Sequence, residues 1–511
     1  MDKILGATTF FVTYGKVRFA KSVYLCKDKK NFNFQKKHTM KKYSFLFLFL
    51  WMVCLWGYAH EKPKYVFYFI GDGMGVNQVL GTEMYLAEVQ GNIGVVPMQF
   101  SLFPHVTMAT TFSATNGVTD SAASGTALAT GNTTKNGAIG VLKDLTTPVN
   151  SVAVWAKEAG MKVGIATSVS VDHATPSAFY AHQGSRNSYY NIGLDLYSTG
   201  FDFYAGSDFL EPYKKNDKEA KNLYELAPEN GYVIARGYKD YLKKSKKTDK
   251  IILFQPEEDS KIDRSAIPYA IDRKKGNLTL LEITRAGINF LTKDNDNGFF
   301  LMVEGGKIDW ACHANDGAAT FQEVIDFDNA VKVAYEFYSQ HPDETLIVIT
   351  ADHSTGGLSL GTGAYELNLQ VLKNQKLSEV GFTKVLNELR KKTKNKVTWE
   401  MVKDALTEYF GFWKEVKISE RTETRLKHVY ERSFQGEAAM EKSEYSQSEP
   451  MASEAKRIIN SAALIGWTSG GHSAGLVPVC AIGVGAEKFS ARTDNSELPK
   501  KIAEIAGYKG K

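Results

Sequence analysis

The stretch "KYVFYFIGDGMG", residues 64–75, joins an apolar run to a single acidic residue that lies between glycines. A continuous run of β-branched and aromatic residues is typical of a strand that is buried on both faces of a parallel sheet. Asp72 follows directly after this strand, at the carboxyl edge where sheets of this kind bind ligands. Aspartate beside glycine is also common in turns, so this position alone fits either role.

Four similar apolar runs recur along the chain and alternate with helical patterns. The expected strands are 162–167, 298–304, 345–350 and 476–485, and the expected helices include 150–160, 280–291 and 319–340. Such alternation predicts an α/β fold, an α/β/α sandwich in which helices cover both faces of a mostly parallel sheet.

Two blocks depart from this alternation. Residues 211–278 mix lysine-rich turns with one short strand, "KIILFQ". Residues 365–460 are dense in Lys and Glu, which predicts solvated helices with little core of their own. We expect this charged helical insertion to pack over the edge or mouth of the sheet, and its charges to form an exposed face more readily than a binding surface.

The segment "MKKYSFLFLFLWMVCLWGYAHEK", which begins at Met40, has the pattern of a secretory signal peptide over residues 40–59. Two lysines precede an apolar run from Phe45 to Trp56, and small residues follow it. The run is too short to span a bilayer comfortably. The pattern therefore predicts export to the periplasm or the medium, without a stable membrane anchor.

Residues 1–39 resemble no targeting element, which is consistent with Met40 as the true start and with a non-native upstream segment. The mature domain would then be residues 60–511. Cys54 offers a site for lipid attachment, although Val53 before it is bulkier than that modification favours. A lipidated, membrane-tethered enzyme therefore stays open as an alternative.

The composition indicates a folded globular protein, with 43% hydrophobic and 23% charged residues among 511. The net charge of +5 comes from the first 59 residues, which hold 11 Lys and Arg against 2 Asp. The rest of the chain has 51 basic and 55 acidic residues, so its charge does not support a nucleic-acid partner. We expect Cys312 and Cys480 to be small buried residues and not a disulfide.

Carboxylates and imidazoles gather where the predicted strands meet the sheet's edge. They are Glu304, Asp309, His313, Asp352, His353 and His472. Each has a structural explanation, as a turn residue, a surface pair on one helix face, or a buried structural histidine. Together with Asp72 they predict a metal site, and histidine and carboxylate ligands without cysteine suit catalytic Zn²⁺, or Mg²⁺ where every ligand is oxygen.

The segment "GVTDSAASGTALATG", residues 117–131, places Asp120 and Ser121 before a helix of small side chains. Both residue types cap helices well. The alternative is that Ser121 is a nucleophile at a helix N-terminus, where backbone N–H groups favour an anion. A further segment, "SVDHATPSAFYAHQGSRN", supplies Arg186, whose guanidinium suits two phosphate oxygens unless it is only a surface residue.

Six of these motifs occur in the order found in the alkaline phosphatase family, which the chain closely resembles. They are "GDGMG", "TDSAASGTA", "HATPSAFYAH…SR", "VEGGKIDWACH", "TADHSTGG" and "GGHSAG", and they extend from about residue 64 to residue 485. The resemblance implies an alkaline phosphatase-like sandwich with two zinc ions and one magnesium ion.

The resemblance also implies a role for each residue at the edge. The implied metal ligands are Asp309, His313 and His472 for the first zinc, Asp72, Asp352 and His353 for the second, and Asp72, Thr175 and Glu304 for magnesium. The implied catalytic residues are Ser121 as nucleophile, Arg186 as phosphate clamp and Asp120 as the residue that orients Arg186.

Two positions depart from other members of the family. His173 stands where some have a magnesium-binding Asp, which implies looser or water-mediated magnesium binding in the second shell. Trp310 stands near the phosphate where others have Lys or His. Its indole carries no charge, so phosphate affinity and product release are the properties that this position affects.

The sequence therefore predicts an exported phosphomonoester hydrolase that releases inorganic phosphate through a phosphoserine. The alternatives are a phosphodiesterase of the same superfamily and an inactive metal- or phosphate-binding protein of the cell envelope. The expected partners are small phosphate monoesters and no specific nucleic acid. A homodimer is also open, since relatives are commonly dimers.

Overall fold

A computed structural model describes residues 62–363, 365–436 and 439–509. The predicted signal peptide at 40–59, Cys54 within it and the upstream segment 1–39 lie outside the described residues. Among the helices of the described part, none combines the length and the apolar character that a membrane crossing requires.

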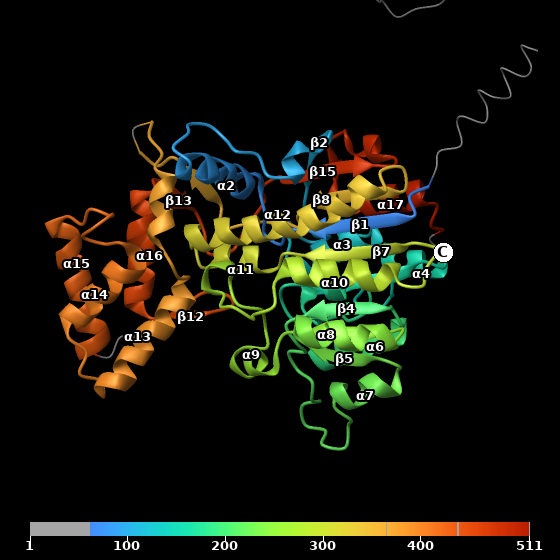
Figure 1. The fold of residues 1–511 in the computed structure, drawn as a ribbon, viewed down its shortest axis with the longest axis horizontal. Helices are drawn as coiled ribbons and strands as arrows, with labels where there is room; N and C mark the ends of the chain where they lie inside the picture. Colours follow the sequence, from blue (N-terminus) through green and yellow to red (C-terminus); the bar gives the residue numbers. More distant parts are fainter. Residues whose placement is uncertain (1–61, 364, 437–438, 510–511) are drawn as a thin grey trace, which may run out of the picture. The chain divides into compact units, whose positions relative to one another are not determined.

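The centre of the fold is a ten-stranded sheet in the order β16-β2-β15-β8-β1-β7-β3-β4-β6-β5 (Figure 1). Its strands are β1 (Tyr65–Ile70), β2 (His105–Thr110), β3 (Lys162–Thr167), β4 (Phe203–Gly206), β5 (Val233–Arg236), β6 (Ile251–Phe254), β7 (Phe299–Glu304), β8 (Thr345–Thr350), β15 (Val477–Gly483) and β16 (Thr493–Asp494). β15 runs antiparallel to both of its neighbours, β8 and β2, and every other adjacent pair is parallel.

The five strands predicted as apolar runs all form. The side chains of β1, β7 and β8 are buried along their whole length, as expected for strands covered on both faces. The block 211–278 contributes two strands, β5 and β6, where the sequence predicted one. β5 was missed because it is a short edge strand, partly exposed, with a weak apolar signal.

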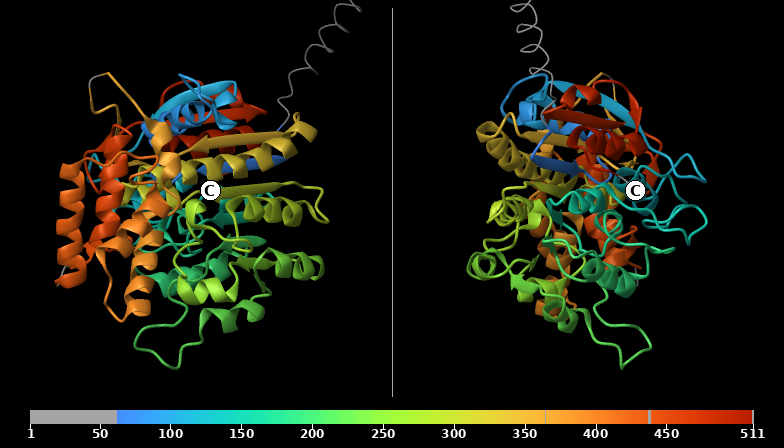
Figure 2. Two further views of the ribbon diagram at one scale, coloured as in Figure 1. Left: turned by 60° about the vertical axis from the view of Figure 1, so that its left-hand side comes forward. Right: turned by 90° about the vertical axis from the view of Figure 1, so that its right-hand side faces the viewer.

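Helices cover both faces of the sheet and confirm the predicted α/β/α sandwich (Figures 1 and 2). One layer holds α2 (Val76–Val89), α8 (Tyr238–Lys244), α10 (Leu280–Thr292) and α12 (Gly317–Gln340). The opposite layer holds α3 (Ser121–Thr130), α4 (Val152–Glu158), α5 (Ala174–Ser177) and α17 (Leu498–Ala506). Two further helices, α6 (Tyr189–Thr199) and α7 (Leu223–Glu229), pack on each other, and α9 (Glu257–Ile262) follows β6.

Residues 365–460 form a group of helices, drawn in orange in Figures 1 and 2. They are α13 (Glu379–Thr393), α14 (Trp399–Phe410), α15 (Glu420–Tyr430) and α16 (Pro450–Ala462), with a short hairpin of β11 (Glu441–Lys442) and β12 (Gln447–Ser448). The expectation of little core was wrong, because these helices bury an apolar cluster that includes Phe382, Leu406 and Ile459. The high overall charge hid an amphipathic spacing that turns apolar residues inward.

Cys312 and Cys480 are both buried and unpaired, as the sequence predicted. They lie in the main apolar cluster around the central sheet. Both of these cysteines therefore act as small core residues, and the described part of the fold has no disulfide.

Asp316 joins the helical insertion to the sandwich. It is buried and precedes α12, and its carboxylate accepts hydrogen bonds from Ala319 N (3.1 Å), Gln375 Nε2 (2.8 Å) and Glu379 N (2.8 Å). A single side chain thus caps α12 and holds the N-terminus of α13.

We expect Asp316→Ala to lower the free energy of unfolding by about 2–4 kcal/mol, because a cap is lost and buried donors are left without acceptors. Urea unfolding of both proteins measures the difference. The exposed Asp296→Ala is the matched control and should stay within about 0.5 kcal/mol of wild type. Equal effects for the two variants would contradict the role of Asp316.

Candidate active site

The carboxyl ends of three neighbouring parallel strands carry the predicted acidic residues. Asp72 follows β1, Glu304 ends β7, and Asp352 with His353 follow β8. Because β15 runs antiparallel to β8, β15 begins at this same edge, and the segment before β15 also lies there. That segment contains β14 (His472–Ser473), which pairs with β9 (Ser354–Thr355) and brings His472 beside His353.

The first group of candidate ligands combines His472 with two residues of α11 (Lys307–His313). Asp309 and His313 lie one turn apart on this helix, as their spacing predicts, and Asp309 Oδ2 is 3.2 Å from His313 Nε2. His472 Nε2 is 3.1 Å from His313 Nε2 and 3.8 Å from Asp309 Oδ1. The two oxygens of Asp309 thus lie near different imidazoles, and the structure brings together Asp309, His353 and His472 in one cluster and His313, Glu444 and His472 in another.

The second group consists of Asp72, Asp352 and His353, all fully buried. His353 Nε2 is 3.5 Å from Asp72 Oδ1 and 3.2 Å from Asp352 Oδ2. His353 also belongs to a cluster with Asp309 and His472, so the two groups adjoin.

A third group brings Asp72 together with Glu304 and His173. Thr175 Oγ1 lies 3.4 Å from Oδ2 of Asp352, a member of the second group. The Thr167 hydroxyl, which sequence reasoning did not identify, donates to one oxygen of Glu304. The other oxygen of Glu304, Oε1, is buried without a hydrogen-bond partner.

Hydrogen bonds to Nδ1 of His313 and His472 determine that Nε2 of each ring faces the site. His313 Nδ1 is 2.6 Å from Gly470 O and His472 Nδ1 is 2.7 Å from Thr119 O, so each Nδ1 carries the proton. These contacts leave Nε2 of both rings with a lone pair toward the cluster, the arrangement that metal-binding histidines use.

His353 is oriented in the same way by a hydroxyl. Thr355 Oγ1 donates to Asp309 Oδ1 at 2.5 Å and can therefore accept from His353 Nδ1 at 3.2 Å. Thr355 is a second residue that the sequence reasoning missed, since a threonine after "ADHS" has no distinguishing signal.

Several buried oxygens at this edge have no hydrogen-bond donor. They are both carboxylate oxygens of Asp72, Oε1 of Glu304 and Oδ2 of Asp309. A buried carboxylate without a partner is costly unless a cation or a proton compensates it. The oxygen and imidazole donors, without thiolate, fit zinc or magnesium, so these residues suit the ions that the family resemblance implies.

The pKa shifts of the buried carboxylates also indicate that nearby positive charge is needed to keep them ionised. Burial raises the pKa of Asp72 well above its usual range, that of Asp352 to about 6 and that of Glu304 to about 8. Burial would also raise the pKa of Asp309, but the neighbouring imidazoles outweigh it and lower that pKa. For His313, burial is outweighed by Asp309, which raises its pKa to about 9.

Ser121 is the first residue of α3, and Asp120 is its N-cap. Asp120 Oδ1 accepts from Ala123 N at 3.0 Å, so the capping interpretation is correct for Asp120. The Ser121 hydroxyl is buried and lies 3.2 Å from His353 Nε2, next to the second group of ligands. Helix capping by Asp120 and a role of Ser121 as nucleophile are therefore compatible.

The small residues of α3 allow a close approach to α5. A Cβ atom on Gly125 would lie 3.2 Å from the Cα of Thr175, which is tighter than most contacts of this kind. A larger side chain here would push apart the helices that carry Ser121 and Thr175.

Arg186 is oriented by groups on either side of it. Its Nη1 donates to Asp120 Oδ2 at 3.2 Å, an oxygen that also accepts from Gly137 N at 3.0 Å. Its Nη2 donates to the hydroxyl of Tyr445 at 3.2 Å and lies 3.5 Å from His173 Nε2. The predicted link between Asp120 and Arg186 is thus present in the structure.

Glu444 and Tyr445, between β11 and β12, are the main site residues that the sequence did not reveal. The Tyr445 ring stacks on Trp310 with centroids 4.6 Å apart and planes 7° apart. Glu444 Oε2 lies 3.5 Å from His313 Nε2. No motif connects this polar stretch to α11, and the one available signal was an aromatic residue among serines and glutamates.

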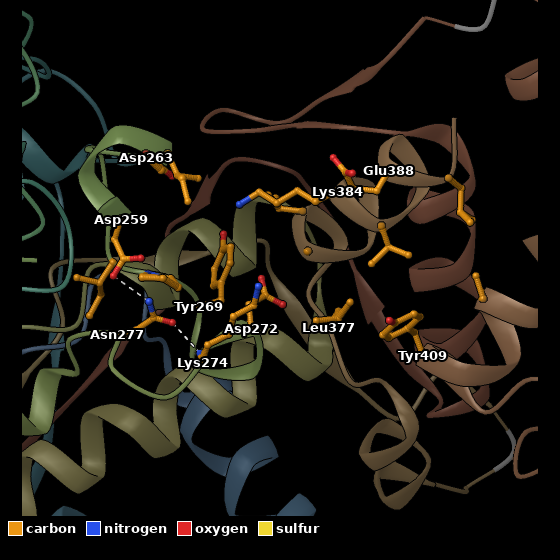
Figure 3. A pocket seen from close by; sticks show the side chains of 18 of the residues that line it. Asp259, Asp263, Tyr269, Asp272, Lys274, Asn277, Leu377, Lys384, Glu388 and Tyr409 are labelled. Atoms are coloured by element: carbon orange, nitrogen blue, oxygen red, sulfur yellow. Dashed lines mark hydrogen bonds between the residues drawn. The ribbon is translucent and has the colours of Figure 1, made fainter. Parts of the chain in front are cut away.

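Two cavities lie near these elements. One of about 830 Å³ lies between η3 (Ala270–Asp272) and the helices α13 and α14, and Tyr269, Lys384 and Tyr409 line it (Figure 3). It contains none of the predicted ligands. A second, of about 470 Å³, is lined by His313 and Gly470 and opens directly beside the first group of ligands.

Comparison with known proteins agrees with this arrangement. The family model described as alkaline phosphatase matches residues 63–199 and 202–508. Alkaline phosphatase 3 of Bacillus subtilis is 31% identical over 453 residues, which cover 88% of this chain and 90% of that protein.

Solved structures show the same similarity. The cold-active alkaline phosphatase of a psychrophilic Shewanella species has a TM-score of 0.70 and 29% identity, with 86% of this chain and 99% of that one covered. A mutant of TAB5 alkaline phosphatase with magnesium bound in its M3 site has a TM-score of 0.60 and 25% identity, with 88% and 99% covered. The chain belongs to the alkaline phosphatase family of phosphomonoester hydrolases.

Proposed function

We propose that this enzyme releases inorganic phosphate from phosphate monoesters through a phosphoserine on Ser121, at a site with two zinc ions and one magnesium ion. One observation carries the proposal. The Ser121 hydroxyl, the Arg186 guanidinium, three imidazoles and buried carboxylate oxygens without a hydrogen-bond partner meet at one edge of the sheet.

We assign the ligands as the family resemblance implies. Asp309, His313 and His472 would hold the first zinc, and Asp72, Asp352 and His353 the second. Magnesium would lie near Asp72, Glu304 and Thr175. When bound, these ions lower the pKa of a nearby hydroxyl and neutralise charge on the phosphate and on the leaving oxygen.

His173 would tune the magnesium site without being a strong ligand. Its Nδ1 is buried without a partner, and burial lowers its pKa to about 3, so the ring is neutral. A neutral imidazole attracts a hard divalent cation less than a carboxylate does, which supports looser magnesium binding. The magnesium-containing mutant of TAB5 alkaline phosphatase is consistent with a family site of this kind.

Arg186 would bind two non-bridging phosphate oxygens with its planar fork, held in place by Asp120 and Tyr445. Ser121 Oγ would then attack phosphorus. The Oγ–P bond forms as the ester P–O bond breaks, and the alcohol leaves with a proton. Water next cleaves the phosphoserine, which releases phosphate and restores the Ser121 hydroxyl. The N-terminus of α3 favours the negative charge on Oγ.

The alcohol part of the substrate would lie on the side of His313, where the cavity of about 470 Å³ opens. Trp310 and Tyr445 present stacked rings near Arg186 in place of a charged residue. Phosphate would therefore be held by Arg186 and the cations without a further side-chain charge, which favours faster product release.

The phosphodiesterase alternative is not favoured, because the chain matches the alkaline phosphatase family model and a diester would need room for a second ester arm beside Arg186. A binding protein without activity would not need Ser121 beside His353. Export, proposed from the segment 40–59, and a homodimer remain expectations from the sequence pattern and the family resemblance.

We expect Ser121→Ala to reduce hydrolysis of an aryl phosphate at least about 10³-fold, because the attacking oxygen is removed. Initial rates of phosphate release at pH ~8–10 measure this loss. Ser188→Ala is the matched control, since its hydroxyl makes no hydrogen bond among the described residues. A Ser121→Ala enzyme with more than a tenth of wild-type activity would exclude the phosphoserine route.

We expect Arg186→Ala to reduce kcat/KM for an aryl monoester about 10²-fold or more, and to reduce turnover of an aryl diester much less. The cause is that a phosphate monoester is a dianion at this pH and a diester is a monoanion, so the monoester gains more from the guanidinium charge. The ratio of the two kcat/KM values is the measurement. A ratio in wild type that favours the diester would support the phosphodiesterase alternative.

We expect the metal-free enzyme to lose thermal stability between pH 7 and pH 9. The folded-state pKa values of Glu304 (about 8) and His313 (about 9) exceed their unfolded values, so the stability from their bound protons disappears as pH rises through them. Zinc and magnesium should replace those protons and abolish the loss. Melting temperatures with and without chelator test this, and parallel pH profiles would contradict it.

A further inference from the structure

Glu444 lies beside His313 and His472, two of the residues proposed to hold the first zinc ion. Its Oε2 is 3.5 Å from His313 Nε2, and the ligand atoms of Glu444, His313 and His472 all lie within 4.8 Å of one another. No motif of the sequence includes this residue. It comes from the hairpin β11–β12, more than 130 residues from His313 along the chain.

The spacing of these atoms suits one four-coordinate ion. With zinc–ligand bonds of about 2.0–2.1 Å, the ligand atoms of a tetrahedral site are about 3.3–3.4 Å apart. The distances from His313 Nε2 are 3.2 Å to Asp309, 3.1 Å to His472 and 3.5 Å to Glu444. Each of these three distances fits two corners of one tetrahedral site, and Glu444 lies within 4.8 Å of both His313 and His472.

The hairpin is fixed on both sides of Glu444. Glu441, three residues earlier, pairs with Arg457 on α16. Tyr445, the next residue, stacks on Trp310 and accepts from Arg186. The Glu444 side chain itself is 49% exposed, so it can move between the cluster and solvent while its neighbours stay bound.

We infer that Glu444 is a fourth protein ligand of the metal ion at Asp309, His313 and His472, and that substrate must displace it. The inference rests on the proposed function. A catalytic zinc site keeps one position open for substrate or water, whereas four protein ligands close it. The Glu444 carboxylate would thus compete with the leaving oxygen and with phosphate for the same position.

A simpler arrangement would be an ion pair between Glu444 and a protonated His313. The metal-ligand arrangement and the ion pair predict different results once metal is bound, because a metal-bound imidazole has no proton on Nε2 to share with Glu444. A metal ligand changes metal affinity and the spectrum of the bound ion. A charge partner that stabilises protonated His313 leaves the spectrum of the loaded enzyme unchanged, and its removal would strengthen zinc binding and not weaken it.

The test compares wild type with Glu444→Ala and Glu444→Gln, and uses Glu441→Gln as the matched control on the same hairpin. Each protein is stripped and reloaded with Co²⁺, whose visible absorption reports the ligands of the ion. Zinc affinity is measured by competition with a chromophoric chelator. Inorganic phosphate is then titrated, and its Kd is read from the cobalt spectrum.

For both Glu444 variants we expect a changed cobalt spectrum and a more weakly held zinc ion, by about tenfold or more. We also expect a several-fold tighter Kd for phosphate, because its competitor is gone. Glu441→Gln should match wild type in all three measurements. If it shows the same changes, the hairpin as a whole and not Glu444 is responsible, and the inference fails.

Unchanged zinc affinity and an unchanged cobalt spectrum in the Glu444 variants would also overturn the inference, while the proposed function would stand. Failure of the proposed function is distinguishable, since wild type itself would then bind no zinc or cobalt at these residues, or would hydrolyse no monoester when loaded.

Discussion

Carboxylates that follow neighbouring strands are buried at one edge of the sheet, and several of their oxygens face no donor. Charge of this density cannot be buried without compensation. Burial raises the pKa values of Asp72, Asp352 and Glu304, which shows that protons would fill this role if cations did not. The architecture of the edge therefore depends on positive charge that the protein does not itself supply.

The backbone explains how so many ligands reach one place. β1, β7 and β8 are adjacent and parallel, and their ends fall level with one another. β15 runs antiparallel to β8, so its N-terminal end lies at the carboxyl edge of the sheet. His472, which precedes β15 in the chain, therefore lies beside His353. One antiparallel strand in a mostly parallel sheet thus closes a cluster that parallel strands alone would leave open.

The helical insertion has two roles in this arrangement. It buries an apolar core of its own and is tied to α12 through Asp316. Its hairpin also extends to the catalytic edge and places Tyr445 against Trp310 and Arg186. The surroundings of Arg186 are therefore formed partly by a segment whose composition indicated only solvated helices. Differences in substrate handling between family members would be expected where such segments differ.

The sequence by itself determined the sandwich, its five main strands and the residues that meet at the edge. These are local signals, since continuous apolar runs indicate buried strands and a polar residue directly after such a run is placed at the strand's end. Asp309 and His313 were also predictable as a pair, because four residues make one helical turn. The resemblance to a known family then related these residues to a common chemistry.

Only the tertiary structure decided what depends on contacts between distant segments. Glu444 and Tyr445 lie in a polar stretch with no periodicity, and nothing local shows that their hairpin folds back onto α11. The orientation of each imidazole by Gly470, Thr119 or Thr355 is likewise a product of packing. The core of residues 365–460 was hidden for the same reason, because composition records how many charges a segment has and not which way its side chains face.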